Sequence, residues 1–208
     1  MKSYRFHLIR HGMTEANEKG LYIGKTDLPL SPLGLRDLLN KKEEARYPRA
    51  TRFYVSPLSR CRQTLEVLYP GSEPIVMDGL AECDFGVWDG RRVEDLKDDE
   101  QFGMWVRGEL QDIPGGERSE DFQDRVMAAF ETLVEESMKN GDDDTVVCTH
   151  GGVIMMIMAA YAFPRADMSA WGTESGCGFT LRVTPSLWMR EPMAEAIDYV
   201  PLIPEKGQ

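Results

Sequence analysis

The residues best suited to chemistry are two histidines, each placed at the end of a predicted strand. Arg10 and His11 follow the apolar residues 6–9, while His150 follows the strand-like residues 145–149 and precedes two glycines. Histidine can act as a nucleophile, and arginine carries a forked, permanent charge that suits phosphate oxygens. Backbone N–H groups at a helix start after His150 would add further donors for an anion. The pattern therefore indicates an anion-binding catalytic site.

Phosphoryl transfer is the chemistry that these residue types fit best. Charge spreads over the phosphoryl oxygens during transfer, so fixed donors are needed on several sides. Arg10 and Arg60 can supply them, and His11 or His150 can attack phosphorus. A leaving alkoxide also needs a proton. Glu82, which lies among turn residues and aromatics, is the predicted general acid, with a pKa raised enough to hold its proton near neutral pH.

A metal site is not expected from this sequence. His7 lies about 13 Å from His11 along an extended strand, so the two cannot readily share an ion, and His7 is interpreted as structural. The cysteines are widely separated and form no paired ligand motif: Cys61, Cys83, Cys148 and Cys177. We therefore predict no metal and no cofactor, and a buried, reduced thiol at Cys148.

Composition limits the classes of partner. The chain has 208 residues, 42% of them hydrophobic, and a net charge of −11. This charge argues against binding to nucleic acid or to anionic membranes, so a local basic pocket must attract any phosphorylated metabolite. The longest uncharged apolar run, residues 151–163, is too short to span a bilayer. We expect a cytoplasmic protein whose partner is a small phosphorylated metabolite; oligomeric state is not indicated.

Strands and helices alternate along the chain. The predicted strands are Tyr4–Arg10, 52–56, 145–149, 178–184 and Ala194–Val200, and the predicted helices are 33–46, 57–69, 119–139 and 151–163. Ser56 is the predicted N-cap of the second helix. Alternation predicts an α/β fold with a largely parallel sheet, in which ligands gather at the carboxyl ends of strands. We expect one domain over residues 1–208, with an excursion at about 82–118 over the site.

Four motifs in this order resemble the histidine phosphatase superfamily, in its phosphoglycerate-mutase-like branch. They are Arg10-His11-Gly12-Met13-Thr14 with Asn17, the run from Ser56 to Thr64, Glu82 with the Phe-Gly-Val-Trp-Asp-Gly of residues 85–90, and Thr149-His150-Gly151-Gly152. Residues 114–117 and Arg125 also resemble a stretch common in this family. Together the motifs are far more specific than any one of them.

The resemblance implies a phosphohistidine mechanism without metal. It implies that His11 is the nucleophile, that Glu82 is the proton donor, and that a phosphate pocket surrounds them. The residues that the resemblance assigns to this pocket are Arg10, Arg60 and His150, with support from Thr14, Asn17 and Gly151. The implied fold is a three-layer α/β/α sandwich with one strand antiparallel to the rest.

Three functions remain open on the sequence. The first is a phosphomonoesterase, because the residues after Glu82 resemble those of α-ribazole and broad-specificity phosphatases; α-ribazole phosphate or a sugar phosphate is then a candidate substrate. The second is a phosphoglycerate mutase, although the interval from Glu82 to His150 lacks the longer insertion typical of mutases. The third is a catalytically silent module that binds a phosphorylated ligand. Departures from the family at Arg91, Arg92, Arg118 and residues 173–178 bear on substrate preference.

Overall fold

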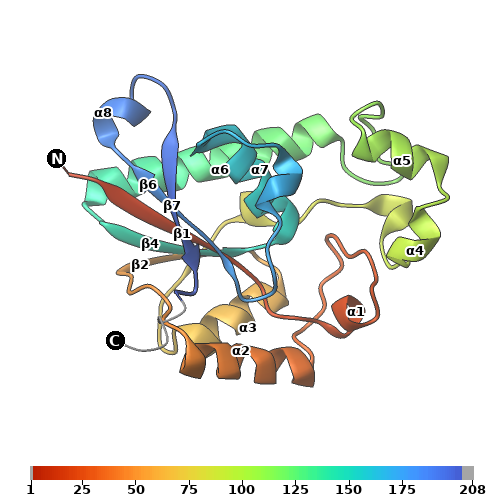
Figure 1. Cartoon of the computed structure of the whole chain (residues 1–208), viewed down its shortest axis with the longest axis horizontal. Helices are drawn as coiled ribbons and strands as arrows, with labels where there is room; N and C mark the ends of the chain where they lie inside the picture. Colours follow the sequence, from red (N-terminus) through yellow and green to blue (C-terminus); the bar gives the residue numbers. More distant parts are fainter. Residues whose placement is uncertain (1, 203–208) are drawn as a thin grey trace.

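In the part of the chain that the structure describes, a mixed seven-stranded sheet with helices on both faces forms the body of the protein (Figure 1). The computed structural model describes residues 2–202, so the prediction of a domain over 1–208 includes ends that lie outside the described residues. The strands are β1 Tyr4–Arg10, β2 Arg52–Val55, β3 Ile75–Val76, β4 Asp144–Thr149, β5 Ala162–Phe163, β6 Gly178–Val183 and β7 Ala194–Val200. Their order is β3-β2-β4-β1-β6-β7-β5.

One strand of this described sheet, β6, runs against the others. It pairs antiparallel with both β1 and β7, whereas β2 and β1 pair parallel with β4, β3 with β2, and β5 with β7. The predicted fold class, a mostly parallel sheet with one antiparallel strand between layers of helices, is confirmed.

The helices flank this sheet or extend from its loops. They are α1 Glu15–Glu18, α2 Pro32–Glu44, α3 Ser59–Leu68, α4 Val93–Leu96, α5 Glu100–Val106, α6 Ser119–Asn140, α7 Gly151–Tyr161 and α8 Pro185–Trp188. In Figure 1, α6 and α7 cover one face of the sheet and α2 and α3 the other. Within residues 2–202, no helix combines the length and the apolar character that crossing a membrane requires.

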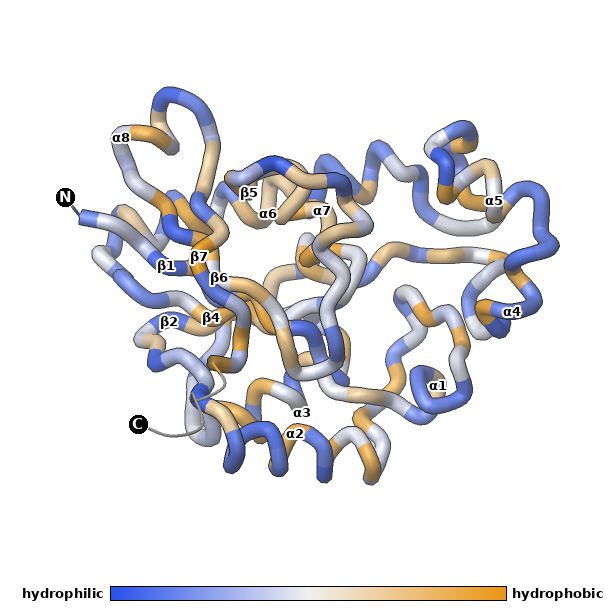
Figure 2. Tube along the Cα trace, in the orientation of Figure 1, coloured by the Kyte–Doolittle hydropathy of each residue, from blue (hydrophilic) through white to orange (hydrophobic). Residues whose placement is uncertain are grey.

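Alternating side chains of the central strands supply a core on each face. In β2, Tyr54 belongs to the cluster beneath α6 and α7, while its neighbour Val55 belongs to the cluster beneath α2 and α3. Val147 and Cys148 in β4 divide in the same way. Successive strand residues point to opposite faces, so a strand covered on both sides is apolar throughout. The apolar strands and the amphipathic α2 are visible in Figure 2.

Helix α6 shows how local sequence defines an element. Phe122, Val126 and Phe130 recur at helical spacing and are all buried in the core. The helix ends at Gly141, whose φ of 79° is a left-handed conformation that glycine adopts without a steric penalty. These features confirm the prediction for residues 119–139 to within one residue.

Helix α3 begins later than predicted. Its N-cap is Leu58, and the helix starts at Ser59 rather than at Pro57. The predicted capping role of Ser56 is therefore wrong. The Ser56 hydroxyl oxygen instead lies 2.7 Å from His150 Nε2 and accepts a hydrogen bond from the Leu58 N–H. A side chain that sequence assigned to a helix end thus lies against a histidine.

The segment from Glu82 to Arg118 extends from the sheet and carries α4 and α5. Tyr22, outside the segment, contacts it with a ring centroid 4.3 Å from that of Phe85. Within the segment, Trp88 packs against Phe102 and Trp105 at 5.3 and 5.6 Å. Trp88 is fully buried. We call this segment, residues 82–118, the cap.

Candidate active site

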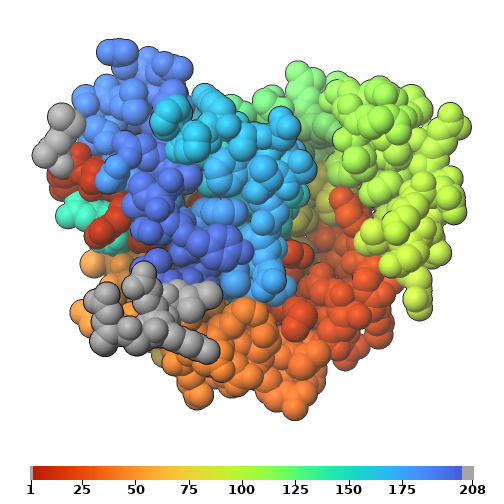
Figure 3. Space-filling model, in the orientation of Figure 1, coloured from red at the N-terminus to blue at the C-terminus, as the bar shows by residue number. Residues whose placement is uncertain are grey.

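Two adjacent parallel strands bring the two histidines together. β1 and β4 are paired with Arg10 opposite Thr149, and the His11 N–H donates to the Thr149 carbonyl at 2.9 Å. Because each histidine immediately follows its strand, the rings lie at the same carboxyl edge, with centroids 5.1 Å apart. Both are buried, at 5% and 0% exposure. Figure 3 shows this face of the molecule hollowed where the N-terminal, cap and α7 segments meet.

His11 has the protonation and orientation of a nucleophile. Its Nδ1 lies 2.7 Å from the Gly12 carbonyl oxygen, which can only accept, so Nδ1 carries the hydrogen and Nε2 keeps its lone pair. Burial, followed by the charges of Arg60 and Arg10, lowers the pKa of His11 to about 3. The ring is therefore neutral near pH 7, the form that can attack phosphorus.

Two arginines place positive charge beside this ring. Arg10 Nη1 donates to the Thr173 carbonyl at 2.6 Å, and its Nε is buried without a partner in the described part of the chain. An unpaired buried donor is costly unless a ligand satisfies it. Arg60, 1% exposed, enters from the first turn of α3 and is held by two backbone carbonyls. Both guanidinium groups are thus fixed where an anion can use their charge.

Side chains from the residue after β2 and from α3 hold the His150 ring. Its Nε2 lies 2.7 Å from Ser56 Oγ and 3.4 Å from Cys61 Sγ. Burial lowers the pKa of His150 well below that of a free histidine, and the nearby His11, Arg60 and Arg10 act in the same direction. A second neutral imidazole therefore faces His11. The Cys61 contact was missed from the sequence because nothing in the motif spacing indicates it.

Glu82 approaches the histidines from the cap. One carboxyl oxygen accepts from the Gly152 N–H and the other from the Cys83 N–H, each at 3.1 Å. Glycine at 152 leaves room for this carboxyl group, because a Cβ there would lie 2.5 Å from Glu82 Oε1 and the carboxyl group would have to shift. Burial raises the pKa of Glu82, against the effect of these hydrogen bonds and of Arg60 and Arg10. The residue is 7% exposed, and burial gives its carboxyl group the character of a proton donor.

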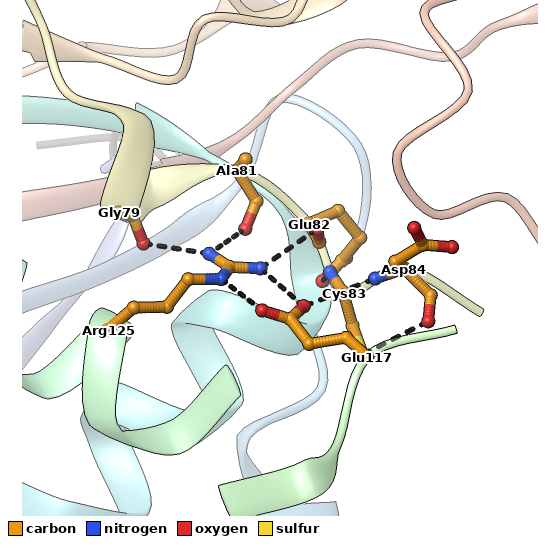
Figure 4. A network of polar contacts seen from close by, with 7 residues as sticks. All are labelled: Gly79, Ala81, Glu82, Cys83, Asp84, Glu117 and Arg125. Carbon is orange, nitrogen blue, oxygen red and sulfur yellow. Dashed lines mark hydrogen bonds and ion pairs between the residues drawn. The ribbon is translucent and has the colours of Figure 1, made fainter. Parts of the chain in front are cut away.

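An arginine on α6 fixes the backbone that carries Glu82 (Figure 4). Arg125 donates to the carbonyls of Gly79, Ala81 and Glu82 at 3.0, 2.7 and 3.1 Å. It also forms a two-point ion pair with Glu117, at 2.6 and 2.9 Å. Burial acts to raise the pKa of Glu117, but the bond and charge of Arg125, together with the Asp84 N–H and the charge of Lys25, lower it overall. Both residues belong to the stretch that resembles the family pattern, and the sequence alone indicates no role for them.

The remaining predicted site residues occupy different positions. Thr14 caps the short helix α1, and its hydroxyl donates to Asn17 Oδ1 at 3.0 Å. The pair therefore forms a capping box, and its part in phosphate binding stays a prediction. Gly151 is the first residue of α7 and lies against Arg10. A Cβ added at Gly151 would be 3.5 Å from Arg10 Nε. His7 lies away from this site, where Thr180 and Asp144 bond its two ring nitrogens.

Arginine charge is the main electrostatic feature of the site as described, since Arg60 and Arg10 both act on the histidines. Among residues 2–202, no group of three or more histidine, cysteine or acidic side chains is arranged to hold an ion. The thiol of Cys148 is buried and free, as predicted, and burial raises its pKa. A neutral nucleophile, two guanidinium groups and a buried carboxyl group together suit the transfer of a phosphoryl group.

This fold and this set of side chains define a phosphoglycerate-mutase-like α/β sandwich with two histidines at the carboxyl edge of its sheet. A family model for the histidine phosphatase superfamily (branch 1) matches residues 6–189, and the chain belongs to that superfamily. Members of this family act on small phosphorylated substrates, as the sequence analysis expected.

Individual relatives agree with this assignment. The chain is 29% identical to an adenosylcobalamin/alpha-ribazole phosphatase of Salmonella typhimurium over 83% of this chain and 87% of the relative. An alpha-ribazole phosphatase from Shigella flexneri shares the fold, with a TM-score of 0.76, 24% identity and 96% of each chain covered. A phosphoglycerate mutase from Thermus thermophilus superimposes with a TM-score of 0.71 at 28% identity, over 95% of this chain and 99% of the mutase.

Proposed function

We propose that this protein is a phosphomonoester hydrolase that works through a phosphohistidine intermediate and needs no metal. The observation that carries the proposal is the buried His11, whose Nδ1 is bonded to the Gly12 carbonyl while Arg10 and Arg60 surround it with positive charge. A lone pair on Nε2 and fixed donors for phosphoryl oxygens are what the first transfer needs.

The reaction would proceed in two transfers. His11 Nε2 attacks phosphorus as the bond to the ester oxygen breaks, and Glu82 gives its proton to the departing alkoxide. The Glu82 carboxylate then takes a proton from water, which attacks the phosphohistidine and regenerates neutral His11 and inorganic phosphate. His150 and Arg60 stabilise the transferring group, and the α7 N-terminus at Gly151 adds backbone donors.

A small phosphate ester is the proposed substrate, with α-ribazole phosphate as the first candidate and sugar phosphates as the second. The relative from Salmonella typhimurium and the phosphatase-like residues after Glu82 support this choice. The mutase alternative has its own support in the Thermus thermophilus neighbour, which is a phosphoglycerate mutase of the same fold. Both reactions use the same phosphohistidine and differ in whether water or a second substrate hydroxyl receives the group.

The purified protein should be incubated separately with α-ribazole phosphate, with sugar phosphates and with 3-phosphoglycerate, measuring free phosphate and 2-phosphoglycerate. Release of phosphate supports the hydrolase. Formation of 2-phosphoglycerate with little free phosphate would overturn it in favour of the mutase, and no turnover of any ester would favour the silent binding module. Acid-labile label on the enzyme during turnover, absent in His11→Ala, identifies the nucleophile.

A further inference from the structure

We propose that Asp89, in the cap, is a positioning residue for the phosphate pocket: it fixes the loop of residues 24–27, and this loop holds Arg60. The proposal rests on the proposed function only in taking Arg60 as a ligand of the phosphoryl group. It assigns to Asp89 a role in anion binding although Asp89 belongs to a different segment of the chain.

The Asp89 carboxylate connects the cap to this loop, which we call the 24–27 loop. Its Oδ1 accepts from the Gly24 N–H at 3.0 Å, and its Oδ2 accepts from the Thr26 hydroxyl. The position of Asp89 is itself well defined, because its N–H donates to the Gly86 carbonyl at 3.1 Å and the neighbouring Trp88 is fully buried. The carboxylate therefore presents two acceptors from a firmly packed segment.

The same two loop residues hold Arg60 from the other side. The Gly24 carbonyl accepts from Arg60 Nη2 at 2.8 Å, and the Thr26 carbonyl accepts from Nη1 at 2.9 Å. These bonds use two of the five N–H donors of the guanidinium group. Because the group is planar, two bonds to one loop define its plane and hence the direction in which its other donors point.

Further contacts leave this loop little freedom. Asp27 Oδ1 accepts from both the N–H and the hydroxyl of Ser59, each at 2.7 Å, at the residue immediately before Arg60. At the other end, Gly24 packs so tightly on the cap that a Cβ there would lie 2.0 Å from the Cys83 carbonyl oxygen. Thr26 thus lies between two fixed points, and Asp89 supplies the bonds that orient its polar groups.

Together these contacts form a continuous connection from the cap to the phosphate pocket. Removal of the Asp89 carboxylate leaves the Gly24 N–H and the Thr26 hydroxyl without their acceptor and allows the loop carbonyls to move. Arg60 then loses its fixed plane, and its charge is less well directed at an anion. Binding of phosphate should weaken even though Asp89 itself is a partner of the loop and not of the ligand.

The experiment measures the dissociation constant of inorganic phosphate by calorimetry on the full chain. Asp89→Ala should raise this constant about tenfold, the usual size of an effect transmitted through residues that orient a ligand-binding group. Asp89→Asn keeps an oxygen for the Gly24 N–H and an amide that can donate to the Thr26 oxygen, so it should restore most of the affinity. Thr26→Val, which removes a single bond, should weaken binding to a smaller extent.

Two controls separate positioning from a general loss of structure. Asp112→Ala removes another cap carboxylate, one paired with the exposed Arg118, and should leave phosphate affinity unchanged. In an Arg60→Lys background, Asp89→Ala should have little further effect, because the planar group through which it acts is gone.

An unchanged phosphate affinity in folded Asp89→Ala, or an equal loss in the Arg60→Lys background, would overturn the proposal. If Asp89→Ala does not fold, Thr26→Val decides by the same comparison. Phosphate binding is measured without turnover, so a protein that binds phosphate through Arg60 but hydrolyses no ester would refute the proposed function and leave this inference standing.

Discussion

His11 should make the folded protein sensitive to mild acid. Its pKa is lowered from 6.5 to about 3 by burial and by the charges of Arg60 and Arg10. Between about pH 3 and pH 6.5, the unfolded chain therefore binds a proton at His11, while the folded protein does not. Because the unfolded state binds more protons there, stability is lost as the pH falls from about 6.5 towards 3.

The size of this effect follows from the two pKa values. Between pH 7 and pH 5 the folded-state ring stays neutral while the unfolded-state ring becomes almost fully charged, which costs about 2 kcal/mol of unfolding free energy. His11→Asn removes the titrating group and keeps an N–H that can donate to the Gly12 carbonyl. The unfolding free energy of the variant should therefore fall by about 2 kcal/mol less than that of the unchanged protein over this interval.

Urea unfolding at pH 5, 6 and 7, in buffers free of phosphate and sulfate, measures the difference. Any fixed cost of the substitution cancels, because only the change with pH is compared, and His7 and His150 titrate in both proteins. Parallel pH dependence of the two proteins would refute the reasoning, since it would mean that His11 titrates alike in the folded and unfolded chains. The uncharged state of His11 between about pH 3 and 6.5 would then lose its basis.

Two further predictions concern Glu82 and the residues that hold it. Glu82→Gln should slow hydrolysis of alkyl phosphates by about 100-fold or more and affect p-nitrophenyl phosphate much less, because only the poorer leaving group needs the proton. In the unchanged protein, kcat/KM should fall at rising pH as Glu82 loses its proton, and the Glu82→Gln variant should lack this fall. Equal losses of activity on both esters would exclude Glu82 as the acid. Arg125→Lys keeps the charge but cannot bridge the carbonyls of Gly79, Ala81 and Glu82 together with Glu117, so kcat should fall roughly tenfold with KM little changed. The exposed Arg118→Lys serves as its matched control, and a loss confined to KM would contradict a role in placing the acid.

Local sequence was sufficient to predict most of the regular elements. The β1 and β7 boundaries agree residue by residue with the predictions, because the β-branched and aromatic side chains in each run favour an extended backbone. The short elements α1, α4, α5, α8 and β3 were not predicted, and residues 162–163, predicted as the end of a helix, form the strand β5. Each of these elements has few residues and therefore little periodicity, so its formation depends on packing against other segments.

The sequence by itself determined the proposed reacting groups: a histidine beside an arginine at one strand end, a second histidine at another, and an acid among aromatics. Which side chains surround them was decided by tertiary structure. Ser56 was interpreted as a helix cap, yet it contacts His150, 94 positions away in the chain. Contacts of Asp89 with the 24–27 loop and of Arg125 with the Glu82 backbone arise in the same way. Such contacts depend on how distant segments pack, and no local pattern of residue types encodes that packing.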